Sequence, residues 1–137
     1  MKILLADDEV EILRLYKEML EGNGHEVTTA RYGSETLDQI AEEAYDMLVL
    51  DLHMPKAKGF DVLKQMQEKG QGIPVIVMTG HYPDEEITER LQGLSLEEVL
   101  RKPVMITTLL NAVNRMVLRS KGNLRGSTAG RSCSPRL

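Results

Sequence analysis

The sequence has a single cysteine and no apolar run long enough to cross a membrane. Cys133 has no partner in the chain, which excludes an internal disulfide and a metal site built from several thiolates. A membrane-spanning helix needs about 20 consecutive apolar residues, and no segment approaches that length. A secretory signal is also missing, because Asp7 and Asp8 follow the first short apolar stretch at once. These absences predict a soluble, cytoplasmic protein.

Acidic residues are missing from the carboxyl-terminal segment 120–137. The chain as a whole has a net charge of −4, so residues 1–119 are more acidic than the average suggests. An acidic body speaks against direct binding of nucleic acid, which needs a lysine- and arginine-rich surface. The content of serine, glycine and arginine predicts that 120–137 is a disordered tail after one domain of residues 1–119. The basic residues of this tail are Lys121, Arg125, Arg131 and Arg136.

Short apolar or β-branched runs alternate with segments whose apolar residues recur at helical spacing. Regular alternation of this kind predicts a parallel sheet with helices on both faces. The expected fold is a three-layer α/β domain with a doubly wound (βα)5 sheet of five parallel strands. Asp8 and Ser34 are expected to cap the helices after the first two strands. The expected strands are residues 2–6, 26–30, 46–50, 74–78 and 97–101.

Polar residues follow or end four of these strands. Asp7 and Asp8 come after the first strand and Asp51 after the third. Thr79 and Lys102 follow the fourth and fifth strands. The carboxyl ends of parallel strands form the ligand-binding edge of such sheets, so these side chains are expected to meet. Clustered carboxylates need a cation, and hard oxygen ligands suit Mg²⁺. A hydroxyl and an ammonium beside that ion suit phosphoryl transfer, in which a carboxylate can act as the nucleophile.

This set of residues resembles the receiver domain of two-component response regulators, which has the CheY-like, flavodoxin-like fold. The resemblance covers residues 1 to about 119. It implies that Asp51 is the phosphoacceptor. It also implies that Asp7, Asp8 and Asp51 hold Mg²⁺ together with the backbone carbonyl of His53.

The same resemblance assigns roles at the ends of the fourth and fifth strands. Thr79 would bond a phosphoryl oxygen and report phosphorylation, and Lys102 would pair with the phosphoryl group. A cis peptide bond is expected before Pro103. Val99 stands where the family usually carries the aromatic residue of its switch, which is a departure from the family pattern.

Further matches fall in the loops that follow the third and fourth strands. Met54, Pro55 and Gly59 match the loop after the acceptor strand. His53 and His81 occupy positions that tune the lifetime of the phosphoryl group in the family.

The resemblance implies a switch rather than an enzyme, apart from the part the domain takes in its own phosphorylation and dephosphorylation. The expected donor is a sensor histidine kinase or a phosphotransfer protein. The expected output is altered binding of an effector protein or a separate output domain. The expected binding face combines the fourth helix, fifth strand and fifth helix. Homodimerisation on phosphorylation is left open.

Two other functions remain open from the sequence. One is a receiver-shaped interaction module that does not need phosphate, which is favoured by Val99 and by the segment 93–96 before the fifth strand. The other is a phosphohydrolase of the haloacid dehalogenase type. That class needs a second aspartate two residues after its nucleophile, whereas His53 stands there in this chain.

Overall fold

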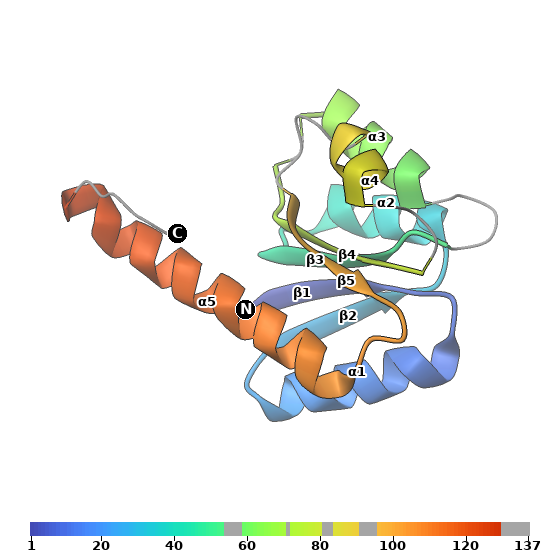
Figure 1. The fold of residues 1–137 in the computed structure, drawn as a ribbon, viewed down its shortest axis with the longest axis horizontal. Helices are drawn as coiled ribbons and strands as arrows, with labels where there is room; N and C mark the ends of the chain where they lie inside the picture. The colour runs from blue at the N-terminus through green and yellow to red at the C-terminus, as the bar shows by residue number, and fades with distance from the viewer. Residues whose placement is uncertain (54–58, 71, 81–83, 91–95, 130–137) are drawn as a thin grey trace.

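The domain is built on a sheet of five parallel strands (Figure 1). The computed structural model describes residues 1–53, 59–70, 72–80, 84–90 and 96–129. The strand order is β2-β1-β3-β4-β5, which confirms the predicted doubly wound fold and places the third strand at the centre. The strands are β1 (Lys2–Ala6), β2 (Glu26–Ala30), β3 (Met47–Asp51), β4 (Val75–Thr79) and β5 (Leu96–Arg101).

The helices form the outer two layers of the fold. In the first helix the buried residues Leu13, Tyr16 and Leu20 recur at helical spacing and therefore share one face. This helix and the last one cover one face of the sheet, and the other three helices cover the opposite face (Figure 1). The helices are α1 (Val10–Gly22), α2 (Gly33–Glu42), α3 (Gly59–Glu68), α4 (Asp84–Arg90) and α5 (Ile106–Ala129).

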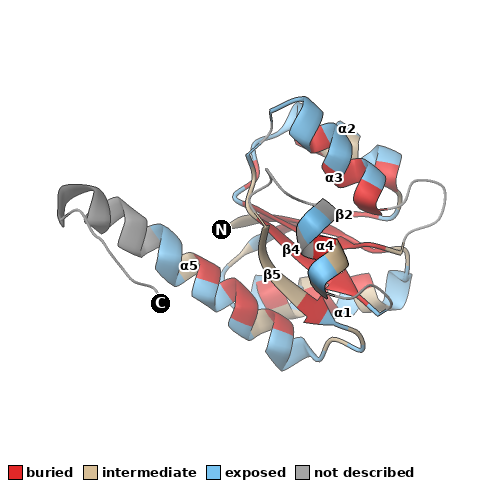
Figure 2. Cartoon of the chain, turned by 45° about the horizontal axis from the view of Figure 1, so that its top comes forward, coloured by how far each residue is buried: buried red, intermediate tan, exposed pale blue. Residues whose placement is uncertain are grey.

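The hydrophobic core is divided in two by the sheet. Successive side chains of a strand point to opposite faces, so Ile3 and Leu5 join the cluster under α1 and α5, while Leu4 and Ala6 join the cluster under α2 and α3. Every residue of β3 and β4 is buried, whereas the outer faces of the helices are exposed (Figure 2). Burial on both faces explains why these strands read as continuous apolar runs.

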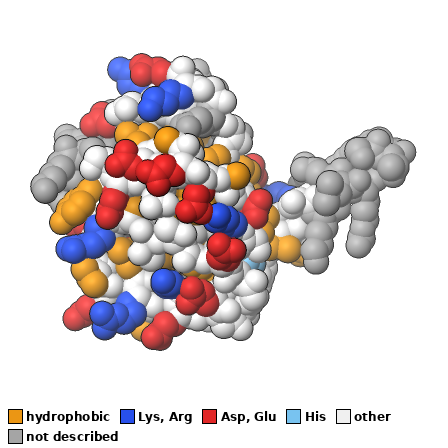
Figure 3. Space-filling view, turned by 180° about the vertical axis from the view of Figure 1, so that it is seen from behind, with side chains coloured by type: hydrophobic (Ala, Val, Ile, Leu, Met, Phe, Trp, Pro, Cys, Tyr) orange, Lys and Arg blue, Asp and Glu red, His pale blue; other side chains and the backbone are white. Residues whose placement is uncertain are grey.

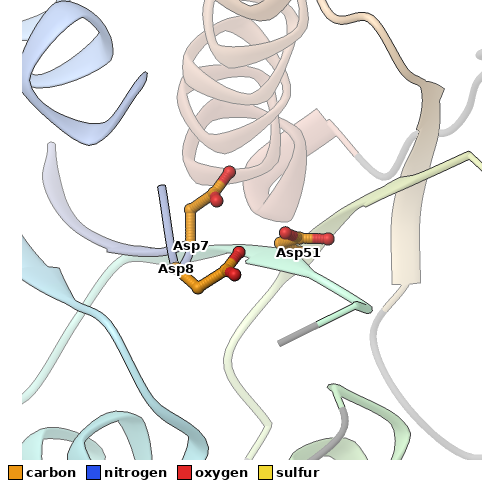
Figure 4. Close-up of side chains that lie close together, drawn as sticks. All are labelled: Asp7, Asp8 and Asp51. Carbon is orange, nitrogen blue, oxygen red and sulfur yellow. The ribbon is translucent and has the colours of Figure 1, made fainter. Parts of the chain in front are cut away.

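Both predicted helix caps are wrong in detail. The N-cap residue of α1 is Glu9 rather than Asp8, and its side chain makes no capping hydrogen bond. The side chain of Asp8 lies among other carboxylates instead (Figure 4). α2 begins before Ser34, with Tyr32 as its N-cap residue. Glu35 Oε1 accepts a hydrogen bond from the backbone N–H of Arg31 at 2.6 Å, which stabilises this earlier start.

The last helix extends beyond the predicted domain boundary. α5 runs to Ala129, into the segment predicted as a disordered tail from residue 120. Helical hydrogen bonds are local, so a helix can continue beyond the turns that pack on the sheet. Residues 130–137 lie outside the described residues, so the prediction for that end of the tail stays a prediction. Within the ranges that the structure describes, no helix is both long enough and apolar enough to cross a membrane.

The face opposite to the view of Figure 1 carries charged side chains of both signs. Acidic and basic side chains lie next to one another across the described part of this face, with apolar side chains between them (Figure 3). Two of the described ion pairs join Arg115 to Glu98 at 2.7 Å and Arg119 to Glu97 at 3.0 Å, and so connect α5 to β5. Charged side chains of β5 and α5 therefore pair with one another where the two elements lie side by side.

Candidate functional site

Three carboxylates meet at the carboxyl ends of β1 and β3. Asp7 and Asp8 directly follow β1, and Asp51 is the last residue of β3. One ligand oxygen from each lies within 4.8 Å of the others, and the side chains project into the same space (Figure 4). Asp7 and Asp51 are 1% and 0% exposed, and Asp8 is half-buried. We call these three residues the carboxylate cluster; the structure brings together the acidic residues that the sequence predicts.

Backbone N–H groups orient two members of the carboxylate cluster in the same way. Asp7 Oδ1 accepts a hydrogen bond from the N–H of Glu9 at 3.0 Å. Asp51 Oδ1 accepts one from the N–H of His53 at 2.9 Å. In each case an aspartate at a strand end accepts from the residue two positions later, which is the geometry of an Asx turn. Each carboxylate is therefore aimed by the turn that follows its own strand.

Lys102 brings a positive charge to the carboxylate cluster. Its Nζ lies 2.8 Å from Asp51 Oδ2, and its backbone N–H donates to the carbonyl of Thr79 at 2.9 Å. Burial alone lowers the pKa of the ammonium, but the hydrogen bond to Asp51 and the charges of Asp51 and Asp7 outweigh it and raise that pKa. Lys102 therefore stays cationic beside the carboxylate of Asp51. The peptide bond between Lys102 and Pro103 is cis.

Thr79 ends β4 with its side chain fully buried. Because Asp51 pairs in register with Met78, Thr79 stands one residue further along the neighbouring strand. Its Oγ1 lies 2.9 Å from Nε2 of the His53 imidazole. The hydroxyl thus belongs to the same edge as Asp51 and Lys102, while its hydrogen bond runs to His53.

Within the described part of the chain, the carboxylate cluster has more negative than positive charge. The pKa of Asp7 is raised to about 7 by burial first and then by the charges of Asp51 and Asp8, although the Glu9 N–H and Lys102 act in the opposite direction. Among the residues that the structure describes, Lys102 provides one positive charge against three carboxylates. Oxygen ligands with this deficit suit a hard divalent cation such as Mg²⁺. Asp7, Asp8 and Asp51 are therefore the residues that could hold a metal ion.

Gly59 packs closely against the backbone at the end of β3. It begins α3, and its N–H donates to the carbonyl of Leu52 at 3.1 Å. A Cβ at this position would lie 2.6 Å from Leu52 Cα and 2.8 Å from the carbonyl oxygen of Asp51. Both neighbours are backbone atoms of β3 and of the turn that follows it, so only glycine fits here without a shift of the site.

Tyr16 is a supporting residue that sequence reasoning missed. Its hydroxyl donates to the carbonyl of Val104 at 2.6 Å, which ties α1 to the segment just after Lys102. Burial, followed by the negative charges of Asp7, Glu9 and Asp51, raises the pKa of this phenol to about 12. The only sequence signal was the helical spacing of Tyr16 with other core residues, which predicts burial but not the hydrogen bond.

The remaining predicted residues are distributed as follows. Val99 lies in β5, half-buried, and packs against the apolar cluster under α2 and α3. Met54, Pro55 and His81 lie outside the described residues, as does most of the segment 93–96. The backbone carbonyl of His53 is expected to be a metal ligand. It belongs to the residue whose N–H closes the Asx turn of Asp51.

A carboxylate cluster with a paired lysine and a hydroxyl, at the carboxyl edge of a β2-β1-β3-β4-β5 sheet, can be compared with known proteins. The sequence profile of the response regulator receiver domain matches residues 3–114. The chain belongs to the response regulator receiver domain family. The resemblance predicted from the strand-end residues is thereby confirmed.

Curated relatives of this receiver domain include longer response regulators. Response regulator MprA of Mycobacterium avium (strain 104) is 33% identical over 123 residues, which cover 88% of this chain and 53% of the relative. MprA of Mycobacterium leprae (strain TN) is 32% identical with the same coverage. The receiver domain thus spans about half the length of the curated relatives it matches.

Solved structures with the same fold include a receiver domain and a response regulator. The Francisella response regulator 1452 receiver domain is 33% identical, with a TM-score of 0.79, and the match covers 87% of this chain and 98% of that one. TrrA of Thermotoga maritima, solved in complex with Mg(2+)-BeF, is 29% identical with a TM-score of 0.71, over 84% of this chain and 97% of that one.

Proposed function

We propose that this receiver domain accepts a phosphoryl group on Asp51 from a sensor histidine kinase or a phosphotransfer protein. The observation that supports the proposal most directly is the ion pair between Lys102 and Asp51 inside the carboxylate cluster. A carboxylate oxygen of Asp51 forms the new bond to phosphorus, and the bond from phosphorus to the donor breaks. The aspartyl phosphate that results belongs to the domain itself, so the domain is a phosphoacceptor that takes part in its own modification rather than an enzyme.

The side chains around Asp51 would offset the charge that arrives with the phosphoryl group. Lys102 contacts the acceptor oxygen and is placed to pair with a phosphoryl oxygen after transfer. Asp7, Asp8, Asp51 and the carbonyl of His53 would hold Mg²⁺, as the donor set and its charge deficit favour. When bound, Mg²⁺ neutralises phosphoryl oxygens during the transfer. The structure of TrrA with Mg(2+)-BeF supports this assignment by likeness.

The output of the switch is proposed to be the face formed by α4, β5 and α5. Thr79 ends β4, which pairs with β5, and the Lys102 that follows β5 is bonded to the backbone of Thr79. A change at Thr79 therefore reaches β5 directly. The bound partner would be an effector protein or an output domain, in keeping with relatives that are longer than this chain. Homodimerisation on phosphorylation is tested by sedimentation before and after the modification.

The proposal is tested by treating wild type and Asp51→Asn with acetyl phosphate, with and without Mg²⁺, and measuring intact mass. Wild type should gain one phosphoryl group only with Mg²⁺, and Asp51→Asn should gain none. Asp38→Asn is a matched control, because Asp38 is an exposed carboxylate of α2 and should leave the gain unchanged. No gain by wild type under any condition would refute the proposal and favour the phosphate-independent module.

A further inference from the structure

The imidazole of His53 bridges the ends of the two central strands β3 and β4. Its Nε2 lies 2.9 Å from Thr79 Oγ1 and 3.4 Å from the backbone nitrogen of Gly80. The backbone N–H of the same histidine donates to Asp51 Oδ1 at 2.9 Å. His53 therefore contacts the acceptor carboxylate with its backbone and the hydroxyl of Thr79 with its ring.

The partners of Nε2 decide the direction of the hydrogen bond to Thr79. A backbone N–H such as that of Gly80 can only donate, so Nε2 acts as an acceptor and the ring proton is on Nδ1. The hydroxyl of Thr79 then donates its single proton to Nε2. In this arrangement that proton is directed at His53 rather than at Asp51.

We propose that His53 is a positioning residue that holds Thr79 in the orientation of the unphosphorylated state. The inference rests on the proposed function, since a hydroxyl that donates to a phosphoryl oxygen on Asp51 has to give up its bond to Nε2. The His53 bond therefore competes with the phosphoryl group for one proton. It opposes the switch by the free energy of that hydrogen bond, which biases the equilibrium between two states.

The test uses beryllofluoride with Mg²⁺ as a phosphoryl analogue that is not hydrolysed, so that the lifetime of the phosphoryl group does not enter. His53→Phe keeps a ring and the backbone carbonyl but removes the acceptor nitrogen. It should bind the analogue about two- to tenfold more tightly, the range for losing one competing hydrogen bond. Affinities are measured by amide NMR titration, with all variants at the same pH. His25→Ala, distant from the site, should bind as wild type does.

A double-mutant cycle with Thr79→Val separates this role from a merely structural one. Val retains the shape of Thr but has no hydroxyl, so His53→Phe should no longer tighten binding in the Thr79→Val background. Unchanged or weaker binding by His53→Phe, or the same gain in both backgrounds, would overturn the inference while leaving phosphoacceptance intact. Failure of wild type to bind the analogue would instead refute the proposed function.

A second measurement needs no substitution. Long-range ¹H–¹⁵N spectra report which ring nitrogen of His53 carries the proton. We expect the proton on Nδ1 in the free domain and a marked change at Nε2 when beryllofluoride and Mg²⁺ bind. A proton on Nε2 in the free domain would contradict the inference, because the ring would then donate to Thr79 and could not accept from it.

Discussion

Replacing Asp7 by asparagine should stabilise the metal-free domain, and by more at high pH than at low pH. Asp7 is 1% exposed, and its pKa in the fold is raised to about 7 from the usual value of 3.8. The native state therefore keeps a proton on this carboxyl between those two pH values, whereas the unfolded chain has lost it. Stability that is fully present below the lower pKa is then lost as the pH rises to about 7.

The magnitude follows from the two pKa values. Between pH 5 and pH 8 the wild type should lose roughly 2–3 kcal/mol of unfolding free energy through this one group. Asparagine cannot ionise, and its amide oxygen can still accept the hydrogen bond from the Glu9 N–H. The advantage of Asp7→Asn over wild type should therefore be larger at pH 8 than at pH 5 by about that amount.

The assay is urea unfolding followed by far-UV circular dichroism, with a chelator present, at both pH values. Asp38→Asn on the surface of α2 should show no such pH dependence. Mg²⁺ should stabilise wild type at pH 8 but not Asp7→Asn, because a ligand that binds only the native state stabilises it. An equal effect of Asp7→Asn at both pH values would refute the reasoning that burial and neighbouring charges keep this carboxyl protonated.

Two further predictions concern the residues that support the site. Gly59→Ala should lower the unfolding free energy by about 1–3 kcal/mol, because the new Cβ meets backbone atoms of Leu52 and Asp51. It should also reduce the phosphoryl gain from acetyl phosphate. Urea unfolding and intact mass that both match wild type would contradict this prediction. Tyr16→Phe should cost about 1 kcal/mol through loss of the hydrogen bond to Val104, and an unfolding midpoint equal to that of wild type would argue against that bond.

The fold and the members of the site could be predicted from the sequence because both depend on patterns along the chain. Strands buried on both faces leave continuous apolar runs, and parallel strands bring their carboxyl ends to one edge. Asp7, Asp51 and Thr79 are recognisable because each stands where such a run ends. No side-chain orientation has to be known for that prediction.

Two hydrogen bonds that support the site could not be predicted because they join distant parts of the chain. The His53 ring reaches Thr79, 26 positions away, and the Tyr16 hydroxyl reaches Val104, 88 positions away. Whether a ring nitrogen or a phenol meets its partner depends on rotamers and on the exact turn after each strand. The predicted caps failed for other reasons: the side chain of Asp8 lies in the carboxylate cluster, and α2 begins before Ser34, with Tyr32 as its N-cap residue.

The order of the strands separates two kinds of surface along the sheet. β3, which carries Asp51, has neighbours on both sides and all five residues buried, whereas β5 is an edge strand with four half-buried residues. Under the proposed function, a substitution near β3 decides whether the chain can be phosphorylated at all. A substitution among the charged residues of β5 and α5 changes only which protein reads the signal. New pathways could therefore arise by altering the charges at one edge, with the chemistry at the centre left as it is.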